Sequence, residues 1–102
     1  MLTIRPNCEY CDIDLLADAP DAMICSYECT FCANCVETRL HNVCPNCGGG
    51  FEKRPIRPKN AYRNGTGLGN APASAKRMHL KHDREKLAEF IHRLKDTPPR
   101  ER

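Results

Sequence analysis

Eight cysteines, all within the first 47 residues, are the side chains of this sequence best suited to chemistry. They form four pairs separated by two or three residues: Cys8 and Cys11, Cys25 and Cys29, Cys32 and Cys35, and Cys44 and Cys47. A Cys-x-x-Cys turn holds two thiolates about 4 Å apart, as two ligands of one zinc ion must be when the bonds are ~2.3 Å long. Four pairs therefore predict two structural sites of four cysteines each, with two Zn2+ as cofactors. A site closed by four thiolates has no open position for a substrate, so we expect a binding protein and not an enzyme.

Other uses of the cysteines fit the sequence less well. A secreted disulfide scaffold needs an export signal, and the N-terminus has no apolar segment of signal length, so we expect a cytoplasmic protein with reduced thiols. A redox Cys-x-x-Cys pair would leave six cysteines unexplained. Iron is the nearer alternative, because residues 44–48 resemble a rubredoxin knuckle, but the next cysteine of a ferredoxin-like run falls on Arg39. No Ser/His/Asp set or HExxH helix is present, and eight cysteines leave no need for a histidine ligand.

Short elements must position these ligands, which makes the expected fold a small, metal-dominated α+β module over residues 1–51. Residues 23–27 and 30–31 contain β-forming side chains and predict a small hairpin. After Cys35, Val36 and Leu40 lie four residues apart and predict one short helix over residues 36–41. A module of this size buries too little apolar surface to fold without a metal or another cross-link.

The second half of the sequence contains no cysteine and predicts two further segments. Residues 52–78 form a basic linker rich in Pro, Gly and Asn, for which we expect a flexible chain without regular elements. Residues 79–102 contain an amphipathic helix that begins after Asp83 and ends near Asp96. Its stripe of Leu87, Ile91 and Leu94 predicts docking on the module or pairing with a second copy in a homodimer. No apolar run is long enough to span a membrane, and we expect no membrane partner.

Charge is divided unevenly between the two halves. Residues 1–50 carry two basic and seven acidic side chains, a net charge of −5, whereas residues 51–102 carry fourteen basic and six acidic ones, a net charge of +8. The basic stretch contains one aromatic residue, Tyr62, among Lys53, Arg54, Arg57, Lys59, Arg63, Lys76, Arg77 and Lys81. This pattern makes weak nucleic-acid binding through the tail an alternative function. The competing explanation of the basic tail is that it neutralises the acidic module of the same chain.

The spacing leaves open which pairs share a metal, because both a sequential and an interleaved grouping can be built from these turns. The eight-ligand spacing, with Cys44-Pro45-Asn46-Cys47 as the last pair, resembles the RING finger, a treble-clef cross-brace. This resemblance covers residues 8–47. It implies that the first and third pairs share one ion and the second and fourth pairs the other. The implied site 1 is Cys8, Cys11, Cys32 and Cys35, and the implied site 2 is Cys25, Cys29, Cys44 and Cys47. The whole chain, including residues 24–32 and 70–74, also resembles an uncharacterised bacterial family of eight-cysteine proteins, domain of unknown function family 1272, which implies no activity.

The RING resemblance further implies a protein-binding surface at Tyr10, Leu40 and Pro45. The sequence departs from ubiquitin-ligase RINGs at Cys29, where histidine is common, at Gly48, where ligases often carry a basic residue, and at Arg39, where tryptophan is frequent. We therefore expect a structural zinc module that mediates protein–protein interaction, with ubiquitin-ligase-like activity as a second alternative. The sequence does not identify the partner.

Overall fold

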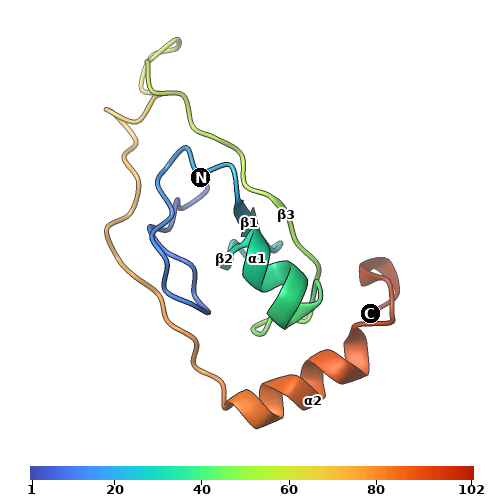
Figure 1. Ribbon diagram of the computed structural model, residues 1–102. Coiled ribbons are helices and arrows are strands. Elements are labelled where there is room, and N and C mark those ends of the chain that lie inside the picture. The colour runs from blue at the N-terminus through green and yellow to red at the C-terminus, as the bar shows by residue number, and fades with distance from the viewer.

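A three-stranded antiparallel sheet lies at the centre of the chain, in a computed structural model that describes all 102 residues. Strand β1 (Ala22–Ile24) is the middle strand, flanked by β2 (Thr30–Cys32) and β3 (Glu52–Lys53) (Figure 1). Met23 pairs with Phe31 on one side and with Lys53 on the other. The predicted hairpin is therefore confirmed. The sheet also takes in β3, which lies just beyond the boundary expected at residue 51.

The short helix starts earlier than predicted. α1 (Ala33–Cys35) continues directly into η1 (Val36–Leu40), a π-helical turn that ends where His41 and Asn42 adopt positive φ. Cys32 caps the start, because its Sγ accepts a hydrogen bond from the backbone N–H of Cys35 at 3.4 Å. The residue that ends β2 is therefore also the N-cap of the helix, which the 3.6-residue periodicity could not reveal.

The core is small and is built partly from the candidate ligands. Five of its fourteen buried residues are cysteines. Phe31 and Phe51 meet edge to face with ring centroids 5.3 Å apart, and this pair joins β2 to the segment before β3. Since so much of the interior is thiol, the apolar packing alone is too small to stabilise the fold. No helix is long and apolar enough to cross a membrane.

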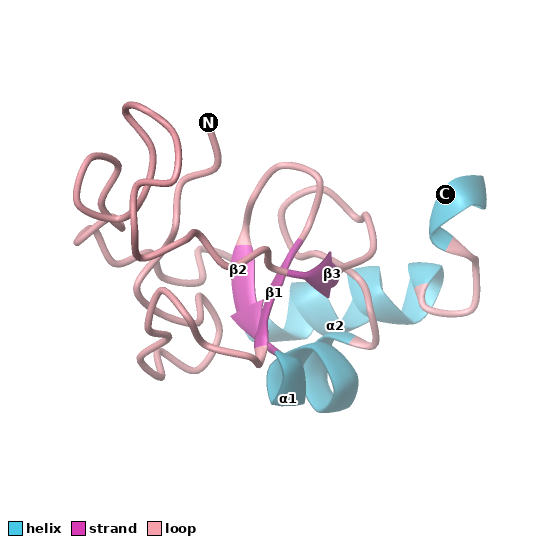
Figure 2. Ribbon diagram, turned by 90° about the horizontal axis from the view of Figure 1, so that it is seen from above, coloured by secondary structure: helices cyan, strands magenta, loops and turns pink.

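The C-terminal helix α2 (Arg84–Leu94) packs on the module, which is one of the two arrangements that its apolar stripe predicted. The Asp83 carboxylate caps it by accepting a hydrogen bond from the Lys86 backbone N–H at 3.1 Å. Leu87 and Ile91 are only 4% and 6% exposed, and both belong to the same buried core as the cysteines. Figures 1 and 2 show α2 alongside α1 on one side of the molecule. Two of the three residues of the apolar stripe are therefore buried within one chain, and Leu94 is partly buried against the same core.

Residues 54–82 form no helix or strand, and they run from β3 around the N-terminal loops to α2 (Figure 1). Arginines nevertheless tie this segment to the module. Arg54, which is 2% exposed, donates to the carbonyl oxygens of Arg5 (2.9 Å) and Leu16 (2.8 Å). Arg77 contacts carboxylate oxygens of Asp12 at 2.9 Å and Asp14 at 2.6 Å, and its guanidinium holds the pKa of Asp12 below its ordinary value. The Pro, Gly and Asn content of residues 52–78 predicted a flexible linker, and that composition does not indicate which arginines bind the module.

Candidate metal centres

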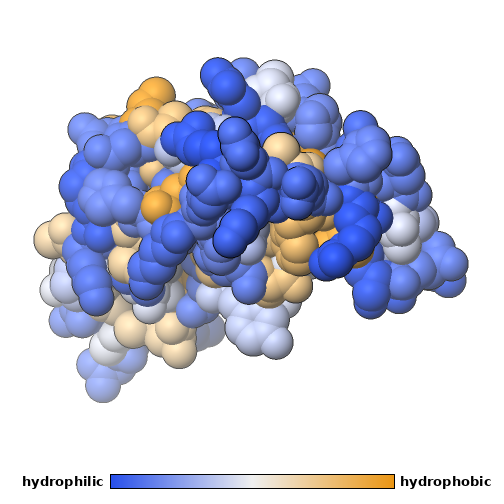
Figure 3. Space-filling model, turned by 90° about the horizontal axis from the view of Figure 1, so that it is seen from below, coloured by the Kyte–Doolittle hydropathy of each residue, from blue (hydrophilic) through white to orange (hydrophobic).

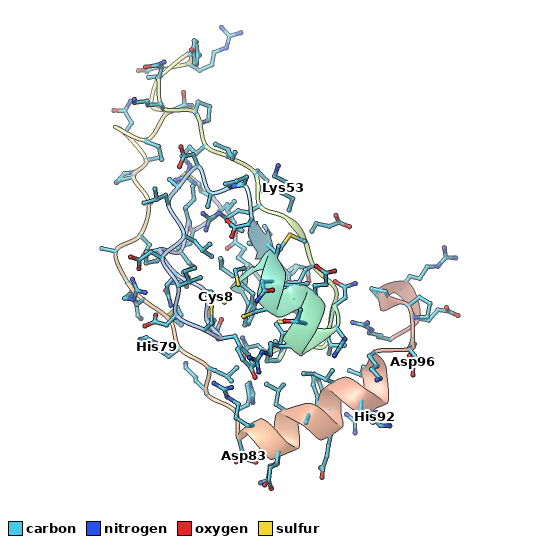
Figure 4. All side chains as sticks on the ribbon, in the orientation of Figure 1. Cys8, Lys53, His79, Asp83, His92 and Asp96 are labelled. Carbon is cyan, nitrogen blue, oxygen red and sulfur yellow. The ribbon has the colours of Figure 1, made fainter.

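The first cysteine cluster joins the N-terminal loop to the start of α1. Cys8 and Cys11 lie on a turn, in which the Asp12 N–H donates to the Cys8 carbonyl at 2.8 Å, while Cys32 ends β2 and Cys35 lies in α1. Their four Sγ atoms all lie within 4.8 Å of one another, and those of Cys11 and Cys32 are 3.8 Å apart. A tetrahedron with metal–sulfur bonds of ~2.3 Å has edges of about 3.8 Å. The donor set and its spacing therefore fit a tetrahedral thiolate-bound ion. Figure 4 shows Cys8 between the N-terminal loops and α1.

The second cluster lies at the other end of the hairpin. The Sγ atoms of Cys25, Cys44 and Cys47 lie within 4.8 Å of one another. Backbone N–H groups point at two of these sulfurs, from Tyr27 to Cys25 at 3.3 Å and from Gly49 to Cys47 at 3.4 Å. Such N–H groups stabilise thiolate charge, as expected of metal-binding turns.

Cys29 lies beside this second cluster but outside the group within 4.8 Å. Interaction with the Cys44 thiol is the main reason why the pKa of Cys29 falls to about 6. The Asn46 side-chain amide also donates to the Cys29 Sγ at 3.3 Å. Cys29 thus lies near the three clustered thiols, and the Asn46 amide would orient its sulfur if it became the fourth ligand.

Electrostatics within both clusters favour a bound cation. Burial raises the pKa of the Cys25 thiol to about 11 and also raises that of Cys35. The hydrogen bond with Cys29, followed by burial, raises the pKa of Cys44 far above its ordinary value. Several thiolates so close together repel one another when no cation is present. A divalent ion removes that cost, and its binding would release the thiol protons.

The sulfur atoms group in the interleaved manner. The first and third pairs come together in one cluster, while Cys25 from the second pair meets both members of the fourth. This is the grouping that the RING resemblance implied and that spacing alone left open. Each cluster connects segments that are distant in sequence, so the two together hold the N-terminal loop, the hairpin, the helix and the turn at residues 44–47. Neither cluster includes a histidine or a carboxylate.

Two of the three residues in the contact surface that the resemblance implied lie in the interior of the molecule. Leu40 is completely buried, and Pro45 is buried as well. Tyr10 is half-buried, because the Arg84 guanidinium lies 4.3 Å from its ring centroid and donates to its hydroxyl at 2.8 Å. The physical reason is α2. The helix packs over this side of the module and withdraws these side chains from solvent.

A polar network around site 2 escaped the sequence analysis. Glu9 is only 7% exposed, and the Asn46 amide donates to its carboxylate at 3.0 Å. The Asn46 Oδ1 lies 2.8 Å from Nε2 of His82. Asn46 therefore links the second cluster to the segment before α2. In the sequence, the only indication of this role is that Asn46 lies between Cys44 and Cys47.

Comparisons with known proteins identify a family and an uncharacterised relative, and they add no activity. The family model described as "Protein of unknown function (DUF1272)" matches residues 1–57, which include all eight cysteines. An uncharacterised protein of Rhizobium meliloti (strain 1021) is 59% identical over 63 residues, which are 62% of this chain and 75% of that protein. No solved structure matches the chain.

Proposed function

The chain belongs to the DUF1272 family, and we propose that it is a structural two-zinc module whose function is to bind a protein partner. The observation that carries the proposal is the interleaved grouping of the cysteines in two clusters that contain thiols alone. Such sites hold a fold together and leave no coordination position for a substrate. Cys8, Cys11, Cys32 and Cys35 would hold one ion, and Cys25, Cys29, Cys44 and Cys47 the other.

Zinc suits these sites because the fold needs the energy that structural zinc supplies. Binding of structural zinc contributes about 10–16 kcal/mol at pH 7 in small domains, which exceeds the whole stability of many proteins. Here the buried core has fourteen residues, of which five are cysteines. A metal that both completes the core and cross-links its loops is therefore the main stabilising factor.

Binding accounts for the remaining surface better than catalysis does. The cleft beside site 2, about 130 Å³ in volume, is lined by Tyr27, Cys29 and Asn46 together with Arg5, Asn7, Glu9, Glu28, Thr30, Met78 and Lys81. It contains no arrangement of nucleophile, base and orienting group. Tyr27 is 76% exposed at its rim, and it also lines a second cleft with Asn46 and Cys47. An exposed tyrosine on a metal-fixed loop is well suited to anchor a protein contact.

Ubiquitin-ligase-like activity gains no support from the geometry. The residues through which a RING would recruit a conjugating partner are covered by α2 or held by Arg84. Figure 3 views the molecule from the side on which α2 lies, and hydrophilic side chains cover most of that face. We therefore place the partner-binding surface around Tyr27, at site 2.

Photo-crosslinking in the native host tests this placement. A photoreactive residue at position 27 should give a discrete crosslinked protein species, and Cys25→Ser should abolish it, because the loop that carries Tyr27 depends on site 2. Leu16, which is 73% exposed, provides the matched control position. Crosslinks that are absent at position 27, or the same as those from position 16, would contradict the proposal.

A further inference from the structure

The basic residues of the segment between β3 and α2 divide into two groups. Residues 53–81, which we call the basic arm, contain eight lysines and arginines and no acidic residue. Arg54, Arg57 and Arg77 are bound to carbonyl or carboxylate oxygens of the module and its neighbouring segments. The other five are exposed, and their side chains take part in no hydrogen bond or ion pair: Lys53, Lys59, Arg63, Lys76 and Lys81. Contacts within the folded chain thus occupy three of the eight cations, one of them paired with carboxylates, and leave five cations free.

The tip of the arm is a loop held by its own hydrogen bonds. In residues 58–71, the Leu68 N–H donates to the Pro58 carbonyl at 2.9 Å and closes the loop. The Thr66 hydroxyl donates to the Arg63 carbonyl at 2.7 Å, and the Asn70 amide donates to the Thr66 carbonyl at 2.9 Å. Arg57 anchors the loop at its base by donating to the carbonyls of Ala71 and Leu2 at 2.8 and 2.6 Å. In Figure 1 this loop projects at the end of the molecule opposite α2.

Gly67 fixes the shape of the tip loop. It is buried with φ of +85°, and a Cβ at this position would lie 2.8 Å from the backbone carbon of Asn60. Backbone atoms cannot move aside cheaply, so only glycine allows the two sides of the loop to approach this closely. Gly69, by contrast, has open space where its Cβ would be and no positive φ. Gly67→Ala should therefore distort the tip loop, and Gly69→Ala, only two positions away, is its matched control.

The tip loop presents one aromatic ring between two free cations. Tyr62 is 76% exposed, and Lys59 and Arg63 flank it in sequence. The Asn60 amide lies 3.4 Å from the Tyr62 hydroxyl, so the polar end of the ring has a partner while the ring itself faces solvent. An exposed ring beside cations is the arrangement that binds unpaired bases, because the ring stacks on a base and the cations neutralise the adjoining phosphates.

We propose that the basic arm binds single-stranded nucleic acid, with Tyr62 stacking on a base and Lys59 and Arg63 contacting phosphates. Lys53, Lys76 and Lys81 extend the contact along the strand. A duplex would hide the base faces from Tyr62, and a lipid surface would need an apolar cluster that the tip loop lacks. Lys81 also lines the cleft beside site 2, so the two surfaces meet at that residue. The stacking site at Tyr62, Lys59 and Arg63 lies on the tip loop and shares no residue with the protein-binding surface at Tyr27.

The five free cations set the expected salt dependence. For a single strand, the slope of log K against log salt is about −0.7 for each phosphate neutralised, so five contacts predict a slope of about −3.5. Loss of one lysine should reduce the slope by about 0.7. Loss of stacking by Tyr62→Ala should weaken binding by about 5- to 150-fold with the slope unchanged.

Fluorescence anisotropy of zinc-loaded protein with labelled 20-mers of uridylate and of thymidylate tests the proposal, with metal content measured on the same samples. Lys59→Ala should weaken binding and lower the slope, whereas Lys95→Ala, which removes the same charge from the end of α2, should change neither. Gly67→Ala should reproduce the loss seen with Tyr62→Ala, and Gly69→Ala should not. Binding of either oligonucleotide supports the arm as the site, and the tighter one identifies RNA or DNA as the natural class.

Three results would overturn the proposal: no binding at low salt by protein that holds two zinc ions, equal effects of Lys59→Ala and Lys95→Ala, or equal affinity for anionic phospholipid vesicles. None of these bears on the partner surface at Tyr27, so failure here leaves the proposed function standing.

Discussion

Leu87→Ala should release α2 from the module without unfolding the zinc sites. Leu87 is 4% exposed and packs in the same core as the buried cysteines, and replacement of such a leucine by alanine costs about 2–5 kcal/mol. Leu87 and Ile91 each contribute about 1.5–3 kcal/mol by burial, and part of that offsets the entropy of ordering the helix. The cost of the substitution is therefore comparable with the whole docking energy. An isolated helix of eleven residues is marginal in water, so an undocked α2 should also melt.

Hydrogen exchange followed by mass spectrometry provides the assay. A loss of 2 kcal/mol corresponds to about a 30-fold rise in opening, so peptides covering residues 84–94 should exchange at least that much faster. Peptides covering residues 22–47 should remain protected, because metal binding holds them. Glu89→Ala, an exposed change on the same helix, serves as the control. Unchanged exchange in α2, or equal loss of protection throughout the module, would refute the reasoning.

Three further perturbations test other parts of the structure. In cobalt-substituted protein, Cys8→Ser and Cys32→Ser should alter the same thiolate-to-metal absorption bands, while Cys25→Ser and Cys44→Ser should alter another set. If Cys8→Ser and Cys25→Ser instead altered the same bands, the sites would be sequential. Arg54→Ala leaves two carbonyl groups without their buried donor, so it should lower the free energy of unfolding of the zinc-loaded protein by about 3 kcal/mol, measured by thermal unfolding. Lys53→Ala, which changes an exposed neighbour, is the control and should leave the free energy of unfolding nearly unchanged. Arg77→Ala should speed exchange in residues 74–82 at low salt and have little effect at 1 M salt, because the Asp12 and Asp14 contacts are exposed and screened.

Local patterns were enough to predict much of this fold. The cysteine pairs, the hairpin at residues 23–31 and the helix that begins after Asp83 each depend on neighbouring residues, so short sequence windows contain the required information. The Leu87 and Ile91 stripe likewise predicted a buried face.

Long-range contacts were not predictable in the same way. Arg54 donates to backbone carbonyl groups that lie 38 and 49 positions away in the sequence. Because every residue type has such a carbonyl group, the sequence does not indicate which residues accept these hydrogen bonds. The burial of Leu40 and Pro45 depends on where α2 docks, which the stripe alone does not specify. The RING resemblance could not indicate this burial, because it ended at residue 47 and α2 lies beyond it.

We propose that two zinc ions, bound by eight thiolates in interleaved sites, hold the first 50 residues in their fold. Elemental analysis of the purified protein, combined with circular dichroism during chelation, tests it most directly. We expect two zinc ions per chain, a colourless protein, and loss of the folded signal as the second ion is removed. One ion per chain, iron with visible absorption, or a module that stays folded after complete chelation would contradict it.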